Sequence, residues 1–60
     1  MKTTVATAEG PPVTLRSTDR GKVLVEVDGH LVVLSIEDAR AMARALTDVA
    51  DHAERDRWKA

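Results

Sequence analysis

The chain has 60 residues, one aromatic residue, no cysteine and a formal net charge of −1. This length allows a single small domain, residues 1–60, which buries only about 60% of the surface that its unfolded chain exposes. Disulfides and thiolate metal sites are excluded, and two histidines do not make a metal cage. Because chains of this size usually need a disulfide, a metal or an oligomer contact, we expect a homo-oligomer.

Acidic and basic residues are interspersed along the chain, without a run of like charge. Such a chain has no strong field that attracts nucleic acid or an anionic membrane, so nucleic acid is a disfavoured, though not excluded, partner. No apolar stretch approaches the ~20 residues of a membrane span, and no apolar segment follows Lys2 as in a secretory signal. We therefore expect a cytoplasmic protein with no membrane contact.

Residues 1–11 are rich in Thr and Ala, and they predict either an edge strand or a flexible segment. Pro11 and Pro12 interrupt any ladder of strands, because proline has no N–H group to donate. The segment VTLR at residues 13–16 alternates apolar and polar side chains, which predicts a half-buried strand.

Turn-forming residues follow at positions 17–21, and the length of this loop decides how the next strand is paired. The face of the predicted sheet that is richer in apolar residues carries Val23, Val25, Val27, Val32 and Leu34. A five-residue loop would pair Leu15 with Val23 and Val13 with Val25, which adds both residues to this face. A four-residue loop would move Val13 and Leu15 to the opposite face.

Asp28-Gly29 lies between two runs rich in Val and Leu, residues 22–27 and 30–34. Asp-Gly in this setting predicts a hairpin with a two-residue type I′ turn, which needs positive φ at both central positions. This turn predicts three cross-strand pairs on one face of the sheet: Val27 with His30, Val25 with Val32, and Val23 with Leu34.

Ser35 is a predicted helix N-cap. Glu37 and Asp38 follow in the first turn, where the helix dipole stabilises acidic side chains. From residue 36 to about residue 57 the chain has no Gly or Pro and is rich in Ala. The predicted fold class is α+β, an antiparallel β-hairpin or three-stranded meander followed by one long C-terminal amphipathic helix. One face of the predicted helix is an apolar stripe, which contains Ile36, Ala39, Met42, Ala43, Leu46, Val49, Ala50 and Ala53.

The predicted hairpin has apolar residues on both faces, and one helix covers only one of them. The second face carries Leu24, Leu31 and Val33 beside Lys22 and Glu26. Small domains tolerate a few exposed aliphatic side chains, but a contiguous apolar patch usually marks a contact surface. We predict an interface at this patch, and the small residues of the helix stripe are an alternative surface for dimerisation.

Trp58 is the fourth candidate interface residue, because Trp often anchors a partner at an interface. Two alternatives remain at this position. The ring can fold back onto the protein as a cap, or it can belong to a frayed helix end.

No residue pattern predicts catalysis, a cofactor or a metal site. Asp48, Asp51 and His52 share the polar helix face with arginines and without a cleft, so we expect a solvated charged surface. Residues 17–19 are turn-forming, and no base is placed to activate a hydroxyl there. No Gly-rich loop opens a helix to hold phosphate.

Residues 34–46, LSIEDARAMARAL, continue to ADHAE at residues 50–54. This pattern resembles small uncharacterised actinobacterial and actinobacteriophage proteins, in which a strand and a Ser or Thr cap precede an Ala/Leu-rich helix. The resemblance covers residues 22–54, about half of the chain. It implies a bacterial or phage cytoplasmic setting and transfers no activity and no site residue.

These observations favour a small non-enzymatic protein-interaction module, homodimeric, that acts by binding another protein. The alternative is a small dimeric DNA-binding regulator that uses a β-ribbon or the basic turn with Arg16, Arg20 and Lys22. Acidic residues dilute this charge, and no aromatic platform is present to stack on bases. DNA binding would weaken steeply with salt, which separates the two hypotheses.

Overall fold

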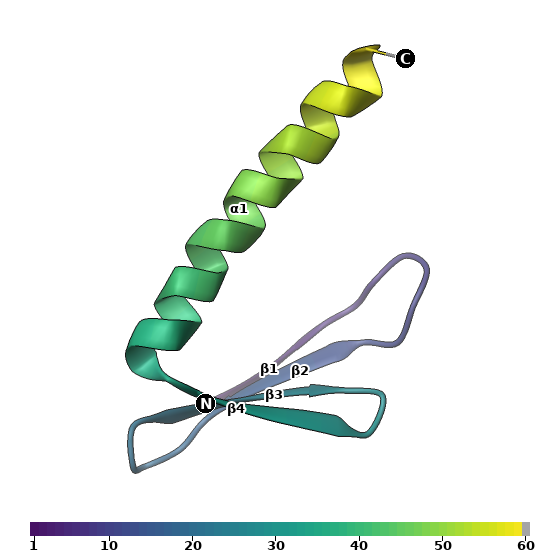
Figure 1. Cartoon of the computed structure of the whole chain (residues 1–60). Coiled ribbons are helices and arrows are strands. Elements are labelled where there is room, and N and C mark those ends of the chain that lie inside the picture. Colours follow the sequence, from purple (N-terminus) through teal and green to yellow (C-terminus); the bar gives the residue numbers. More distant parts are fainter. Residues whose placement is uncertain (60) are drawn as a thin grey trace.

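The computed structural model describes residues 1–59, in which four antiparallel strands precede one helix (Figure 1). The predicted α+β class is confirmed, with one strand more than the expected hairpin or three-stranded meander. The sheet is a meander in the order β1-β2-β3-β4, so β1 and β4 form its two edges. The elements are β1 (Lys2–Val5), β2 (Val13–Ser17), β3 (Lys22–Val27), β4 (His30–Ser35) and α1 (Ile36–Lys59).

The additional strand β1 comes from the Thr-rich N-terminus, for which an edge strand was one of two predicted alternatives. Its Thr and Val side chains are β-branched, which favours extended backbone. The Ser17 N–H donates to the Met1 carbonyl at 3.0 Å and fastens the start of β1 to the end of β2. All four residues of β1 are exposed, so β1 contributes pairing to the sheet and little burial.

The β3–β4 hairpin has the predicted turn and register. Asp28 has φ of 50° and Gly29 has φ of 81°, as a type I′ turn requires. All three predicted pairs are present in the ladder: Val27 with His30, Val25 with Val32, and Val23 with Leu34.

Neither of the two loop lengths considered from the sequence gives the observed pairing of β2 with β3, which differs by two residues from that of the five-residue loop. Leu15 pairs with Val25 and Val13 with Val27, where Val23 and Val25 were expected as the partners. A shift of two residues keeps every side chain on the same face, so Val13 and Leu15 still lie on the predicted one.

The cause of the shift is the geometry of the β2–β3 turn. The Thr18 N–H donates to the Lys22 carbonyl at 3.0 Å, and the Gly21 N–H donates to the Thr18 carbonyl at 3.4 Å. Gly21 has φ of 73°, which makes this a three-residue loop closed by a left-handed glycine. The Thr18 hydroxyl also accepts from the Arg20 and Lys22 N–H groups and tightens the turn.

The helix begins at the predicted cap. The Ser35 Oγ accepts a hydrogen bond of 3.1 Å from the Asp38 N–H, so Ser35 satisfies one of the free donors of the first turn. The 24 residues of α1 extend for about 36 Å, whereas the six residues of β4 extend for about 20 Å. The second half of α1 therefore projects beyond the sheet (Figure 1).

No hydrophobic core forms within the part of the chain whose burial the structure describes. Of residues 1–58, whose burial the structure describes, not one is buried. The radius of gyration is 13.7 Å, against about 10 Å for a compact chain of this length. The helix contacts β3 and β4 and diverges from the sheet toward its C-terminal end (Figure 1), where Leu46 and Val49 of its apolar stripe are exposed.

Candidate protein-binding surfaces

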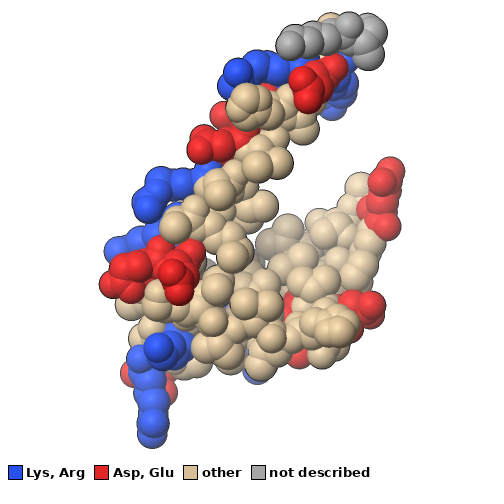
Figure 2. All heavy atoms as spheres, viewed as in Figure 1, with Lys and Arg blue, Asp and Glu red and all other residues tan. Residues whose placement is uncertain are grey.

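An apolar cleft separates α1 from the sheet. Its cavity volume is about 350 Å³. Figure 2 shows this hollow, with uncharged side chains along the sheet and the adjoining helix surface. The sheet therefore turns its richer apolar face toward the helix, as predicted. The lining residues are Val5, Val13, Leu15, Val23, Val25 and Leu34 from the sheet, and Ala39, Met42, Ala43 and Leu46 from the helix.

The apolar stripe of α1 continues past this cleft without cover. Leu46 is 65% exposed and Val49 is 66% exposed, although both belong to the face turned toward the sheet side. Val32 on β4 is 50% exposed in the same way. Exposed apolar area of this extent is unfavourable in water, so the cleft and stripe together are a candidate protein-binding surface.

The outer face of the sheet carries the patch that the sequence predicts as an interface. Leu24 lies directly opposite Val33, and Leu31 lies opposite Glu26 on the neighbouring strand. Leu31 and Val33 are each more than half exposed, and Leu24 is half-buried. Three of the four candidate residues therefore share one small patch on the edge strand β4 and its neighbour β3.

Trp58 lies apart from this patch, close to the end of α1. Its side chain is 77% exposed, and the Arg57 guanidinium carbon lies 5.8 Å from the centre of its ring. The ring therefore does not fold back as a cap on the sheet.

Charged residues of the strands and turns separate toward the two ends of the sheet (Figure 2). We call the end at the β2–β3 turn the basic end and the end at the β3–β4 turn the acidic end. Asp19 also lies in the β2–β3 turn, and the acidic first turn of α1 begins nearby. The basic end holds Lys2, Arg16, Arg20 and Lys22, and the acidic end holds Glu9, Glu26 and Asp28.

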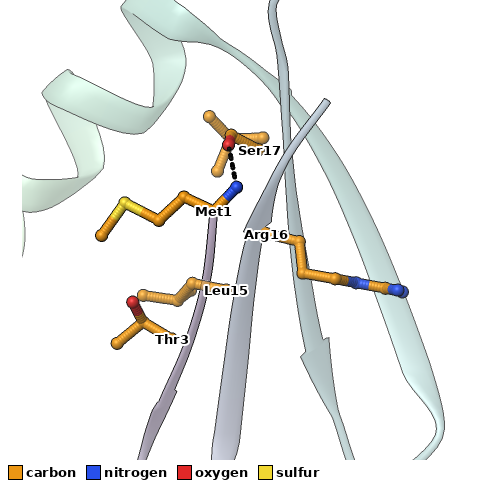
Figure 3. Close-up of a pocket in the computed structure, with 6 residues that line it drawn as sticks. Met1, Thr3, Leu15, Arg16 and Ser17 are labelled. Atoms are coloured by element: carbon orange, nitrogen blue, oxygen red, sulfur yellow. Dashed lines mark hydrogen bonds between the residues drawn. The ribbon is translucent and has the colours of Figure 1, made fainter. Parts of the chain in front are cut away.

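A smaller hollow of about 240 Å³ lies beside the N-terminus (Figure 3). Its lining includes Met1, Thr3, Leu15 and Ser17. The Met1 amino group donates to the Ser17 Oγ at 3.1 Å, so this hydroxyl anchors the N-terminus. This hydrogen bond connects the residue that precedes β1 with the last residue of β2.

No metal-ligating cluster forms: residues 1–59 bring together no group of three or more His, Asp or Glu side chains. Asp48, Asp51 and His52 are exposed on the helix surface. Over the same range, no helix has the length and apolar character needed to span a membrane.

The sequence reasoning missed the cleft and directed attention to the outer face. The available signal was a mismatch of lengths, because a helical stripe that reaches Ala53 is longer than any strand of the predicted hairpin can cover. Comparisons of the chain with protein-family models, curated proteins and solved structures found no match.

Proposed function

We propose that the protein is a small non-enzymatic protein-interaction module that works as a homodimer and binds another protein. The observation that supports it is excess exposed surface. The chain exposes 5229 Å², against about 3,800 Å² for a compact monomer of this mass. The excess is about 1,400 Å² per chain, or about 2,800 Å² for two chains, which falls in the range of obligate homodimer interfaces.

Within this proposal, a second copy covers the cleft and the open stripe of α1. Full burial of a Leu or Val side chain contributes about 1.5–3 kcal/mol, so covering Leu46, Val49 and Val32 in both chains is a large stabilising term. The outer patch of Leu24 and its neighbours Leu31 and Val33 is then the surface for a different protein.

Sedimentation equilibrium tests the proposal. We expect a dimer at tens of micromolar, an order of magnitude typical of such assembly, and a melting midpoint that rises with protein concentration. A stable monomer of 6.5 kDa, with a midpoint independent of concentration, would contradict it.

A pair of helix variants makes this test specific to the cleft. Leu46→Glu places a charge in the stripe and should shift the protein toward monomer or unfold it, because an unpaired buried charge is costly. Thr47→Glu adds the same charge one residue later, outside the stripe, and should leave the dimer intact. Equal effects of the two variants would show that the stripe has no special role.

The basic end of the sheet supports a second candidate function, a small dimeric DNA-binding regulator. Its four basic residues would contact phosphates, and binding would weaken with a log–log salt slope of about −0.9 per phosphate contact. Titration of duplex DNA at two salt concentrations decides between the candidates. The interaction-module proposal predicts no measurable DNA binding at either salt concentration.

A further inference from the structure

The two edges of the sheet differ in how they are protected against pairing with another chain. Natural edge strands usually carry charged residues, prolines or bulges that prevent such pairing. β1 carries Lys2 and leads into a loop with two prolines. β4 has the sequence HLVVLS, with no Lys, Asp, Glu, Arg or Pro, and three consecutive residues at its centre, Leu31 to Val33, are at least half exposed.

The free backbone groups of β4 follow from its pairing with β3. Val27 and His30 close the type I′ turn and therefore form a hydrogen-bonded pair. Hydrogen-bonded and non-hydrogen-bonded pairs alternate along an antiparallel ladder. The even-numbered residues of β4 thus direct their N–H and C=O groups toward β3, while Leu31 and Val33 direct theirs away from the sheet.

We propose that β4 pairs antiparallel with β4 of a second copy, which joins the two sheets into one continuous sheet of eight strands. This inference rests on the proposed homodimer and names its geometry. Val32 lies opposite Val32 of the second copy on the two-fold axis, and Leu31 lies opposite the second copy's Val33. In this register residues 30–34 are all paired, and the helix begins beyond the paired segment in both copies.

Charge complementarity selects a second copy in this orientation. An antiparallel two-fold arrangement reverses the second sheet, so the basic end of one sheet lies beside the acidic end of the other. Lys22 and Arg20 then approach the side of the second copy that carries Glu26 and Asp28. Glu37 and Asp38 follow β4 at the basic end, so the favourable charge pairing is that of Lys22 and Arg20 with the second copy's Glu26 and Asp28, which steers the encounter of the two chains.

The position of α1 makes the edge and the cleft one continuous surface. The helix follows β4 directly and lies over the apolar face of the sheet. Two-fold pairing at β4 therefore brings both helices over the same face of the joined sheet, where each covers the open stripe of the other. The excess surface of about 1,400 Å² per chain matches what such an interface must cover.

The same pairing joins the two outer patches. Leu31 of each copy lies beside the second copy's Val33 on the outer face, so two small apolar clusters become one strip across the dimer axis. This strip is the surface that the dimer offers to a different protein, and a monomer presents only half of it.

Cysteine crosslinking tests the pairing, because the natural chain contains no cysteine. In the proposed register, the Cα atoms of the two Val32 residues are about 4.5 Å apart, as in a non-hydrogen-bonded pair. A disulfide accepts a Cα separation of about 4.4–6.8 Å. Val32→Cys should therefore form a disulfide-linked dimer when treated with a thiol oxidant. Thr3→Cys occupies the corresponding position of the other edge strand, β1, and serves as the matched control.

We expect Val32→Cys to crosslink at least tenfold faster than Thr3→Cys in dilute solution. Equal rates, or a faster reaction of Thr3→Cys, would overturn the pairing. Sedimentation of the unsubstituted protein separates this failure from failure of the proposed function. A dimer without the Val32 crosslink refutes the β4 pairing alone, whereas a monomer refutes the homodimer itself.

A second pair of variants distinguishes edge pairing from stacking of outer faces. Val33→Lys protects the edge in the way that natural edge strands do and should weaken dimerisation at least tenfold. Leu24→Lys places the same charge on the same outer face, one strand inward, and should weaken dimerisation much less. An equal loss in both variants would favour stacked outer faces and overturn the edge pairing.

Discussion

The two hairpins of the sheet are built from different kinds of sequence. β3 and β4 are rich in Val and Leu and are joined by two residues in a type I′ turn. β1 and β2 are shorter and are joined by a seven-residue loop with Gly10 and two prolines. The β3–β4 hairpin ends in an unprotected apolar edge, β4, and the β1–β2 hairpin ends in a Thr-rich edge with a lysine, β1.

In the proposed dimer, this difference predicts that the β4 side of the molecule, and not the β1 side, faces the second copy. An edge strand that is protected against pairing prevents aggregation of a sheet. β1 is such an edge, because it carries a lysine and few apolar residues. β4 combines exposed apolar side chains on both faces with free backbone groups along its edge. A chain that lacks a closed core can gain one at this side, and the β1 side has little apolar area to offer.

Gly29→Val should produce the largest effect of the substitutions that compare the hairpins. Gly29 has φ of 81°, and a β-branched residue there costs on the order of 1–3 kcal/mol in backbone strain. Gly10→Val is the control in the β1–β2 loop. An added Cβ at Gly10 has its nearest contact, Thr7 Oγ1, at 3.5 Å, and Gly10 lacks positive φ. Denaturant unfolding should show a clear loss for Gly29→Val and little change for Gly10→Val; similar losses would contradict the turn assignment.

Ser35→Ala should lower the free energy of unfolding by about 1 kcal/mol, because it removes the acceptor for the Asp38 N–H. Ser35→Asp is the control, since aspartate caps helices about as well as serine. An unchanged unfolding midpoint for Ser35→Ala would mean that the helix start is stabilised by other contacts.

Thr7→Ala should have a smaller effect, below about 1 kcal/mol. The Thr7 hydroxyl accepts from the Gly10 N–H at 3.1 Å and lies 2.6 Å from the Gly10 carbonyl oxygen, so it organises the β1–β2 loop. Thr7→Ser keeps this hydroxyl and should be neutral. A loss as large as that of Ser35→Ala would show that β1 contributes more to stability than its exposure indicates.

Lys2→Val should change the free energy of unfolding least, within about 0.5 kcal/mol, as is usual for exposed sites. It removes the one charged residue of β1 and makes this edge resemble β4. We therefore expect species larger than the dimer in sedimentation velocity. If Lys2→Val and the natural protein give the same distribution, the contrast between the two edges does not depend on charge.

The parts of this fold that were predictable are those with local causes. Asp28-Gly29 dictates its turn through backbone sterics, and Ser35 caps the helix through a hydrogen bond three residues away. The β2–β3 register was missed by two residues, because the turn geometry at Thr18 and Gly21 shifts the count without changing the hydrophobic alternation. The sequence alone does not decide whether residues 1–11 form a strand or a flexible segment, because Thr-rich edges carry no burial signal.

The cleft was not predictable in the same way. Helix periodicity identifies the apolar stripe, but it does not say how much of that stripe the chain's own sheet covers. That amount depends on the angle between α1 and the sheet, which depends in turn on how the side chains of α1 pack on β3 and β4. The outer patch of Leu24, Leu31 and Val33 could be read from the hairpin register, and its use as an interface remains a prediction.

Amide hydrogen exchange at the two edges tests the central claim most directly. The Ser17 N–H donates to the Met1 carbonyl, so by alternation the Thr4 N–H points away from β2 and is free at the β1 edge. In the proposed dimer, the Leu31 and Val33 N–H groups are hydrogen-bonded to the second copy. We predict that these two amides exchange slowly at concentrations where the dimer forms, while the Thr4 amide exchanges rapidly. If the Leu31 and Val33 amides exchanged as rapidly as the Thr4 amide at every protein concentration, the β4 pairing would be contradicted.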